Sequence, residues 1–370
     1  MQAGIASSIG DIDAGAWNAL VASDYPFLQH DFLLALEQHN CLEPWGWQPV
    51  IFQIHENDEL VGACASYIKT NSYGEFVFDW AWAEAYQRNG IDYYPKLVTA
   101  IPFTPARGPR LLARNHDAGV KQQLTKLILA FCEQQKLSSC HFLFCEQDDM
   151  QALQQQQCLR RYDYQYHWHN QNYADFDDFL AALNSKRRKN IRRERRQVRE
   201  AGIRVEMLPG EALSDSQWQQ LFDFYQITFM RKSGTPTFTL DFFRAMAHRL
   251  RAVFAYEANR AVAGAICYQG GGVLYGRHWG CYHHFDNLHF EVCYYQGIDY
   301  CIQNKLHTFE PGAQGEHKIW RGFLPVKTES AHWIAHPQFR QAIADFLQHE
   351  ERAMQQYGEQ LMDASPYRKT

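Results

Sequence analysis

The sequence predicts an α+β protein built from two similar domains, each a mostly antiparallel sheet flanked by helices. Its 370 residues exceed what one ordinary core supports, so two domains are expected. A strand–turn–strand pattern at 51–63 recurs at 253–265, with Phe, Asn, Gly and Ala at matching positions. A long helical segment followed by a short strand then closes each half, at 120–144 and 290–309. Helices combined with an antiparallel meander are typical of an α+β layer.

Composition places the chain among globular proteins and excludes several other classes. It is 46% hydrophobic and 15% aromatic, with a formal net charge of −5. Residues 1–9 lack the basic start and apolar run of a signal peptide, and no apolar stretch is long enough to span a membrane. Ten cysteines without a C-x-x-C pair predict reduced, mostly buried thiols in a cytoplasmic protein.

The elements of the first half follow from local patterns. A short helix is expected from Asp31, ahead of a hairpin whose turn contains Asn57, a residue that tolerates positive φ. The alternation of large aromatic residues predicts a half-buried strand after the hairpin; these residues are Phe76, Phe78, Trp80 and Trp82.

A helix at 120–136 and a strand at 140–144 are expected to follow. The alternating aromatic residues of 162–168 predict one more strand, which we expect to end an N-terminal domain of residues 1–170.

The second half repeats this plan. A helix from Asp241 precedes a hairpin with Asn259 in its turn, and Gly270–Gly272 predicts the next hairpin turn. The expected later elements are a strand at 273–275, helices at 290–305 and 337–360, and a strand at 307–309. We therefore expect a C-terminal domain at 203–370, joined to the first by linking helices at 171–202.

The linker contains the main concentration of positive charge in the chain. Eight basic side chains and one acid, Glu194, fall within 185–196. Only Ile191 and Val198 are apolar along 186–199, too few for an ordinary amphipathic helix. The alternatives are a solvated charged face and a phosphate-binding surface, for tRNA, a nucleotide-linked precursor or the diphosphate of coenzyme A, because guanidinium groups bind phosphate bidentately. We expect no DNA binding, because the rest of the chain is acidic.

The order of the elements and two sequence segments resemble known families. The element order, duplicated, resembles tandem GNAT acyltransferase domains. The linker NSKRRKNIRR at 184–193, followed by GIRV at 202–205, resembles the entry to the second domain of FemAB/FemX peptidyl- and aminoacyltransferases. The stretch FEPGAQGEHKIWRGF at 309–323, with Tyr294 and Tyr295 before it, resembles a FemAB-like family of bacterial N-acyltransferases associated with peptidoglycan. The resemblance implies transfer of an acyl or aminoacyl group to an amine.

The 309–323 segment supplies the catalytic candidates Glu310, Glu316, His317 and Lys318. Acyl transfer to an amine needs a base for the ammonium proton and a donor for the developing oxyanion. Glu316 or His317 is the candidate base. The resemblance places Lys318 near the reacting carbonyl. A salt-bridged structural loop is the alternative.

The candidate binding residues come from three places. The candidate phosphate ligands are Lys186, Arg187, Arg188, Arg192 and Arg321. Tyr275 and Arg277 lie on the strand expected beside the acyl group, where Gly276 and Gly280 would allow close approach. Glu291, Tyr294 and Tyr295 share one helix face by spacing and are expected to point together into the cleft.

No metal or tightly bound cofactor is expected, because the spacing of Cys281, His283, His284, His289 and Cys293 fits no zinc pattern. Residues 104–110 occupy the position of a GNAT pyrophosphate loop, but two prolines and an incomplete glycine pattern argue against acetyl-CoA binding there. With no nucleophile motif, direct transfer is preferred.

The resulting hypothesis is a cytoplasmic N-acyltransferase that uses a phosphate-bearing donor, either acyl-CoA or aminoacyl-tRNA, and an amine acceptor in cell-wall peptide metabolism. The enzymatic alternative is an acetyltransferase acting on a small amine or a protein terminus. The non-enzymatic alternative is a recognition protein of the same fold that binds a peptidoglycan precursor or nucleic acid.

Overall fold

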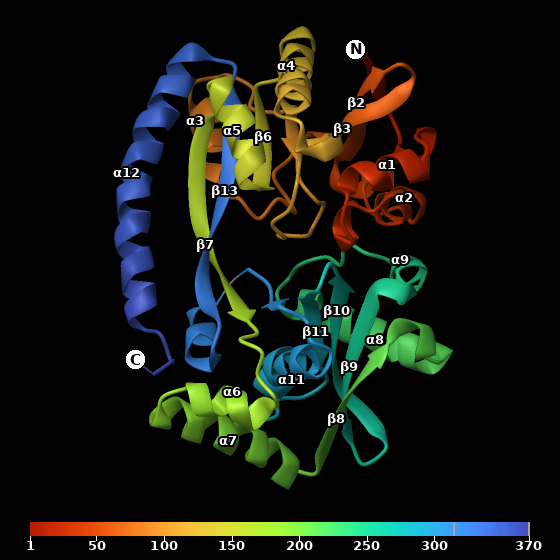
Figure 1. Cartoon of the computed structure of the whole chain (residues 1–370), viewed down its shortest axis with the longest axis vertical. Coiled ribbons are helices and arrows are strands. Elements are labelled where there is room, and N and C mark those ends of the chain that lie inside the picture. The colour runs from red at the N-terminus through yellow and green to blue at the C-terminus, as the bar shows by residue number, and fades with distance from the viewer. Residues whose placement is uncertain (314, 369–370) are drawn as a thin grey trace. The chain divides into compact units, whose positions relative to one another are not determined.

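The computed structural model describes residues 1–313 and 315–368, so Gln314 of the predicted catalytic segment lies outside the described residues. The chain forms two units. The first contains Met1–Asp163 and Lys327–Gln356, and the second contains Tyr164–Val326 and the chain from Tyr357 onward. The first unit therefore includes a segment from near the C-terminus, and the strands β7 (Leu159–His169) and β13 (Leu324–Ile334) each contribute residues to both units (Figure 1).

The sheet of the first unit has the strand order β1-β2-β3-β4-β6-β13-β7, with β5 beside β3. Neighbours are antiparallel from β1 to β4, β4 and β6 are parallel, and β13 is antiparallel to β6. Its other strands are β1 (Gln2–Ala6), β2 (Trp47–Glu56), β3 (Glu59–Lys69), β4 (Lys96–Thr99), β5 (Leu112–Ala113) and β6 (Ser139–Cys145). Its helices are α1 (Ala14–Val21), α2 (His30–Gln38), α3 (Trp80–Arg88), α4 (Ala118–Gln134), α5 (Gln147–Gln155) and α12 (Pro337–Asp363), the last of which continues into the second unit.

The second unit has the order β7-β12-β11-β10-β9-β8, antiparallel except for the parallel pair β11 and β12. Its strands are β8 (Ile203–Pro209), β9 (Leu250–Glu257), β10 (Arg260–Gly270), β11 (Val273–Cys281) and β12 (Thr308–Glu310). Its helices are α6 (Phe176–Ala182), α7 (Ser185–Glu200), α8 (Asp215–Arg231), α9 (Leu240–Ala245), α10 (Leu288–Phe290) and α11 (Gln296–Gln303). A π-helical turn, Glu291–Tyr295, joins α10 to α11, and a 3₁₀ helix covers Glu316–Arg321.

Helices cover both faces of the second sheet. Gly264 of β10 and Gly280 of β11 are paired, and a Cβ on Gly280 would lie 1.9 Å from the carbonyl oxygen of Phe224 in α8. Successive strand residues point to opposite faces, and Ala263 and Ala265 pack in the cluster that contains Val198 of α7. Gly280 therefore allows the backbone of α8 to pack closely against β11. The expectation that Gly280 makes room for the acyl group is not met.

The two predicted hairpins form, and they share a detail that supports duplication. β2 pairs with β3 and β9 with β10, and each pair has a register shift close to its turn. Asn57 has the expected positive φ of 51°, but in the second turn the positive φ of 52° falls on Ala258 rather than on Asn259.

One predicted strand is wrong. Phe76 and Phe78 lie in a loop, while Trp80 and Trp82 begin α3. The alternation therefore does not build a half-buried face: Phe78 is 53% exposed, whereas Trp82 is 5% exposed.

Other expectations hold for the described residues. Helices occur at 118–134, 288–303 and 337–363 and strands at 139–145 and 159–169, close to their predicted positions. No cysteine forms a disulfide, and nine of the ten are buried. Within 1–313 and 315–368, no helix is both long and apolar enough to cross a bilayer.

Candidate functional site

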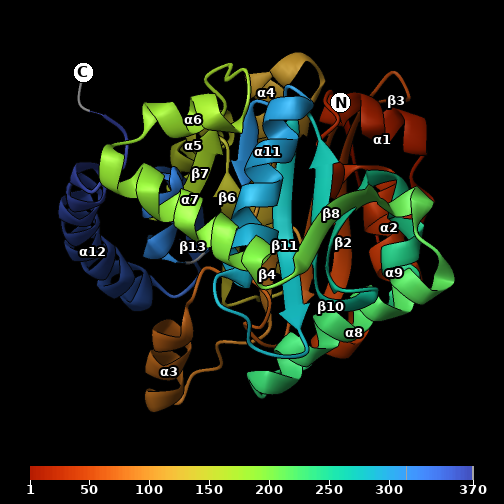
Figure 2. The same cartoon turned by 90° about the horizontal axis from the view of Figure 1, so that it is seen from below.

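All fourteen residues that the sequence singles out lie in the second unit, on α7, β11, the π-helical turn, β12 and the 3₁₀ helix. Figure 2 shows α7 and α11 near one another, with β11 beside α11. The helix α7 starts because the side chain of Asn184 accepts a hydrogen bond from the Arg187 N–H. Ile191 and Val198 are its two buried residues, so they attach a strongly charged helix to the core.

The inward side of α7 is neutralised by specific ion pairs. Arg195 donates to both carboxylate oxygens of Glu291 and also contacts Asp299. Glu194 accepts hydrogen bonds from Arg321, with an Nη2–Oε1 distance of 2.9 Å, and from the Tyr295 hydroxyl. Because the pairs are largely buried, the loss of one partner would leave a desolvated charge. Glu291, Tyr295 and Arg321 therefore hold α7 in place.

The remaining candidate phosphate ligands are distributed around α7 and differ in exposure. Lys186 is exposed, and the partly exposed Arg187 places its guanidinium 4.7 Å from the ring centroid of Trp320. Arg192 forms an exposed ion pair with Asp177. Arg188 is half-buried on the same helix. The structure thus divides the predicted cluster: Lys186 and Arg192 are exposed, Arg187 and Arg188 are half-buried, and Arg321 is buried.

A β-bulge on β11 opens a small cavity. Ile266 of β10 pairs with His278, but the next residue, Cys267, pairs with Gly276, so Arg277 is the extra residue of β11. A cavity of about 100 Å³ lies at this bulge, lined by Gly276, Arg277, His289, Cys293, Tyr294, Pro311 and neighbouring strand residues. A bulge leaves one residue out of the ladder and is common beside active sites.

Lys318 lies in the 3₁₀ helix beside this region. It is 2% exposed, and its ammonium group donates a 2.7 Å hydrogen bond to the carbonyl oxygen of Gly312, the residue after Pro311 of the cavity wall. Burial, together with the nearby Arg277 guanidinium, lowers the pKa of Lys318 to about 7. Among the described residues the ammonium group thus bonds to a neutral carbonyl and to no carboxylate.

The two candidate bases differ in their surroundings. His317 Nε2 lies 2.9 Å from the hydroxyl of Tyr294, which lines the cavity. Burial, followed by Arg321 and Lys318, lowers the pKa of His317, so it is neutral at pH 7. Glu316 is exposed, and its carboxylate accepts a hydrogen bond of 2.7 Å from Tyr357. The geometry therefore connects His317, but not Glu316, to the cavity.

Glu310 ends β12 as a buried carboxylate. Its oxygens lie 3.5 Å from Arg277 Nη2 and 3.9 Å from His167 Nδ1. Arg277 also lies with its guanidinium 5.2 Å from the ring centroid of Tyr275. Glu310, Arg277 and Tyr275 therefore form one buried group behind the bulge.

Sequence reasoning missed two features of the site. The π-helical turn changes the spacing at 291–295, so Tyr294 contacts His317 while Glu291 and Tyr295 contact α7. His289 also lines the cavity, and burial, followed by the influence of His317, Lys318 and Arg321, lowers its pKa to about 4. Turns of this kind are frequent at functional sites, but nothing in the local residue pattern marks one.

The loop 104–110 of the first unit turns inward. The Arg110 guanidinium donates to the carbonyl oxygens of Leu143 and Ala106. A Cβ on Gly108 would lie 2.7 Å from the Tyr25 ring. The guanidinium donors of Arg110 are therefore used within the first unit. Among the described residues, no group of three His, Cys, Asp or Glu side chains is arranged to hold a metal ion.

Three solved structures share this fold at low sequence identity. FemX matches with a TM-score of 0.55 and 11% identity, covering 93% of this chain and 100% of its own. The C-terminal domain of a putative lysylphosphatidylglycerol synthetase from Agrobacterium fabrum matches at 0.53 and 9%, covering 91% and 96%. L-PGS from Bacillus licheniformis matches at 0.52 and 11%, covering 88% and 98%. These likenesses confirm the predicted fold.

A family model for peptidoglycan biosynthesis/recognition, FemAB-like, matches residues 8–369. No curated protein matches the sequence. The resemblance seen in the linker and in 309–323 is confirmed. The chain therefore belongs to the FemAB-like family of peptidoglycan biosynthesis and recognition. Membership in this family confirms the enzyme class that the sequence predicts, an acyl- or aminoacyltransferase of cell-wall-related metabolism.

Proposed function

We propose that the second unit transfers an acyl or aminoacyl group to an amine at the cavity beside the β11 bulge. The observation that carries this proposal is Lys318, a buried lysine whose pKa is lowered to about 7 and whose hydrogen-bond partner among the described residues is a single carbonyl oxygen. Perturbed titratable groups beside a cavity are characteristic of catalytic sites. The bulge and the small cavity supply a place for the reacting carbonyl.

In the proposed reaction, the acceptor nitrogen attacks the donor carbonyl, and negative charge develops on the carbonyl oxygen. The protonated Lys318 donates a hydrogen bond to that oxygen, and the backbone N–H of Arg277, out of the ladder at the bulge, is a second candidate donor. When the tetrahedral intermediate collapses, the bond to the leaving group breaks and the amide remains. No covalent enzyme intermediate is needed.

His317 is the proposed base. It is neutral at pH 7 because its pKa is lowered, and its Nε2 reaches the cavity through Tyr294. It would take the proton that the acceptor nitrogen loses as the new C–N bond forms. Glu316 is the weaker candidate because it is exposed and bonded to Tyr357.

The phosphates of the donor would bind on the outer side of α7. Lys186, Lys189 and Arg193 are exposed there, and none has a side-chain partner among the described residues. These cations suit either the diphosphate of an acyl-CoA or the backbone of an aminoacyl-tRNA. The family description supports an amine of a peptidoglycan precursor as the acceptor.

A thermal-shift experiment distinguishes the donors, because a ligand that binds only the native state raises the melting temperature. The full chain would be tested with coenzyme A, acetyl-CoA, bulk tRNA and a UDP-linked cell-wall precursor, each at low and high salt. Stabilisation by the coenzymes supports an acyl-CoA donor. Stabilisation by tRNA that weakens steeply with salt supports an aminoacyl-tRNA donor.

Charge reversal locates the donor site. Lys189→Glu combined with Arg193→Glu should abolish the donor-induced shift, while Lys126→Glu, on the exposed side of α4 in the first unit, should preserve it. Equal shifts in both variants would remove α7 from the proposal. Precursor binding without turnover under any donor, unchanged by Lys318→Met, would favour the recognition protein instead.

A further inference from the structure

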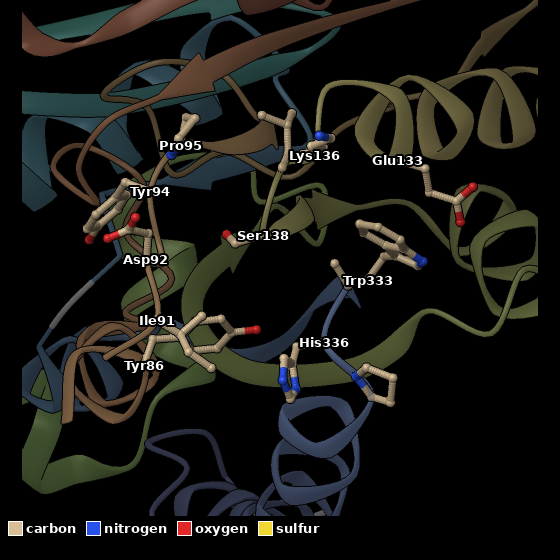
Figure 3. A pocket seen from close by; sticks show the side chains of 13 residues that line it. Tyr86, Ile91, Asp92, Tyr94, Pro95, Glu133, Lys136, Ser138, Trp333 and His336 are labelled. Carbon is tan, nitrogen blue, oxygen red and sulfur yellow. The ribbon is translucent and has the colours of Figure 1, made fainter. Parts of the chain in front are cut away.

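A larger pocket lies in the first unit, and none of the residues discussed for acyl transfer lines it. Its volume is about 670 Å³, within the range of small-molecule sites. Its wall is built from three segments: residues 91–95 before β4, 133–138 between α4 and β6, and 333–337 between β13 and α12. Figure 3 shows these side chains arranged around the pocket.

Backbone hydrogen bonds connect the three segments into a fixed frame. The N–H of Ala335 donates to the carbonyl oxygen of Ser138 at 2.9 Å, and the N–H of Ser138 donates to that of Pro95 at 3.3 Å. Tyr86 of α3 stacks on Phe339 of α12 with ring centroids 3.9 Å apart. The pocket is therefore preformed within a single unit.

Two polar atoms at the base of the pocket have no hydrogen-bond partner among the described residues. They are the phenol oxygen of Tyr86 and Nδ1 of His336, both buried atoms. Tyr86 is 1% exposed, and Figure 3 shows its hydroxyl pointing toward the space beside His336 and Trp333. Burial raises the pKa of Tyr86 to about 12, so the phenol keeps its proton at neutral pH and can donate it. An unpaired buried hydroxyl costs free energy unless something else pairs with it.

Charged side chains of both signs stand at the rim. Asp92 and Glu133 are exposed acids, Lys136 is an exposed base, and none of them forms an ion pair within the described chain. Apolar and aromatic side chains, including Ile91, Leu137 and Trp333, form the walls. A ligand that matches this lining has an ammonium group, a carboxylate and an apolar body.

We propose that this pocket binds a small zwitterion, an amino acid or a short peptide with both ends free. Its ammonium group pairs with Asp92 or Glu133, and its carboxylate with Lys136. A polar group in its middle, such as a peptide carbonyl, accepts a hydrogen bond from the Tyr86 hydroxyl. The pocket is independent of the proposed transfer site, so either proposal can fail without the other.

The test is isothermal titration calorimetry on the full chain with the tripeptide Ala-Leu-Ala, its N-acetyl derivative and its C-terminal amide. The free tripeptide should bind, and each capped form should bind at least tenfold more weakly. Lys136→Ala should weaken binding of the free peptide to the level of the amide. Lys126→Ala, which removes an exposed lysine of α4 outside the pocket, should bind as the wild type does.

Tyr86→Phe separates ligand recognition from folding. Because the hydroxyl has no partner, this variant should melt at the same or a higher temperature than the wild type, yet bind the tripeptide at least tenfold more weakly. No binding at millimolar peptide, or equal binding of the free and capped forms, would overturn the proposal. A lower melting temperature of Tyr86→Phe together with unchanged peptide binding would also overturn it, because the hydroxyl would then serve the fold.

Discussion

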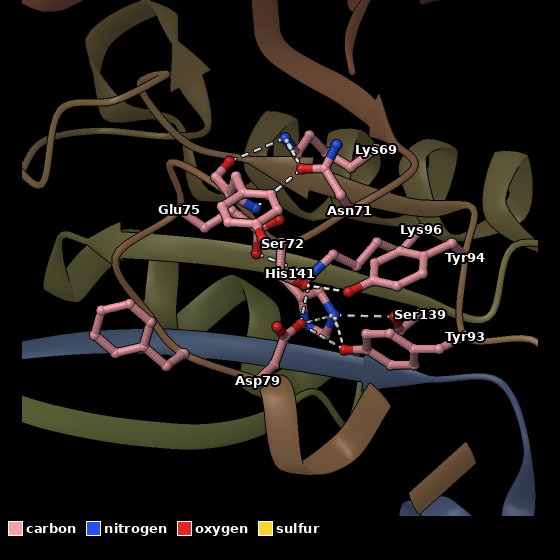
Figure 4. A network of polar contacts seen from close by, with 12 residues as sticks. Lys69, Asn71, Ser72, Glu75, Asp79, Tyr93, Tyr94, Lys96, Ser139 and His141 are labelled. Carbon is pink, nitrogen blue, oxygen red and sulfur yellow. Dashed lines mark hydrogen bonds and ion pairs between the residues drawn. The ribbon is translucent and has the colours of Figure 1, made fainter. Parts of the chain in front are cut away.

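Both units contain buried lysines, and Lys96 of the first unit and Lys318 of the second are held in opposite ways. Lys96 of β4 is fully buried, and its ammonium group contacts the carboxylates of Glu75, at 2.9 Å, and Asp79 (Figure 4). Lys318, among the described residues, donates a hydrogen bond to a single carbonyl oxygen, that of Gly312. The first arrangement pairs a cation with two anions, whereas the second leaves a desolvated amine that readily loses its proton.

The contacts around Lys96 extend into a network. Asp79 accepts a hydrogen bond of 2.6 Å from Tyr93, whose hydroxyl also lies 3.0 Å from His141 Nε2. His141 and His332 face each other through Nδ1 atoms 2.8 Å apart, and burial lowers the pKa of His141 to about 3, so it is neutral. Because Glu75 and Asp79 precede α3, the network holds the loop after β3 in position. The comparison indicates that Lys96 is held in a structural network by its counter-charges, whereas Lys318 has no bonded carboxylate among the described residues.

The largest expected effect is on stability, from Lys96→Met. This change leaves Glu75 and Asp79 buried without their cation, so the free energy of unfolding should fall by about 3–5 kcal/mol. Urea unfolding followed by tryptophan fluorescence measures it, with Lys126→Met as the exposed control. A loss no larger than that of the control would contradict the structural role of Lys96.

Lys318→Met should have the reverse profile. Removing an oxyanion donor lowers kcat about 10²–10³-fold. The free energy of unfolding should change by no more than about 1 kcal/mol, because one hydrogen bond is lost but a desolvated cation is removed with it. Transfer assays with the donor identified by thermal shift, together with urea unfolding, give both values. Full turnover in this variant would exclude Lys318 from the reaction.

The pH profile of kcat/KM should be bell-shaped, with effects of about tenfold per pH unit on each side. On the acid side the rate rises as His317 becomes neutral, below its ordinary pKa of 6.5 because burial lowers that pKa. On the alkaline side it falls above about pH 7, as Lys318 loses the proton that it donates. His317→Gln should remove the acid limb and keep the alkaline one. An unchanged acid limb in that variant would assign the base to another group.

The smallest effect is expected from Phe78→Ser in the loop before α3. Its side chain is 53% exposed, so the free energy of unfolding should change by about 0.5 kcal/mol or less. Trp82, 5% exposed at the start of α3, is the matched contrast, and Trp82→Ser should cost several times more. Equal losses would mean that Phe78 is as buried as its sequence pattern first suggests.

Much of the fold could be predicted because it depends on local patterns. The hairpin at 47–69 and the helix at 118–134 follow from periodicity and turn residues, and the duplication follows from their repetition. The loop at 76–80 could not, because its position depends on Glu75 and Asp79 reaching Lys96, contacts about twenty residues away. Alternating large residues share one buried face only where their segment forms a strand that pairs with a neighbouring strand.

The candidate site shows the same division. Residue types in 309–323 indicated acyl transfer, and the family confirmed that enzyme class. Phosphate binding on α7 stays a prediction. The sequence could not show that Arg321 pairs with Glu194, 127 residues earlier in the chain. Nor could it show that the π-helical turn gives Tyr294 and Tyr295 different partners, His317 and Glu194. Those facts depend on long-range packing, which changes the use of a residue without changing its type.

The contribution of residues 327–356 to the first unit has a consequence for biosynthesis. The strand β13 lies between β6 and β7 in the first sheet and pairs Ala331 with Phe142. During translation, the ribosome therefore makes residues 164–326 of the second unit before most of β13, the strand between β6 and β7, has been made. The first sheet keeps an open edge at β6 until β13 (Leu324–Ile334) has been made, and a gene fragment cut after residue 163 would encode a first sheet that lacks this strand.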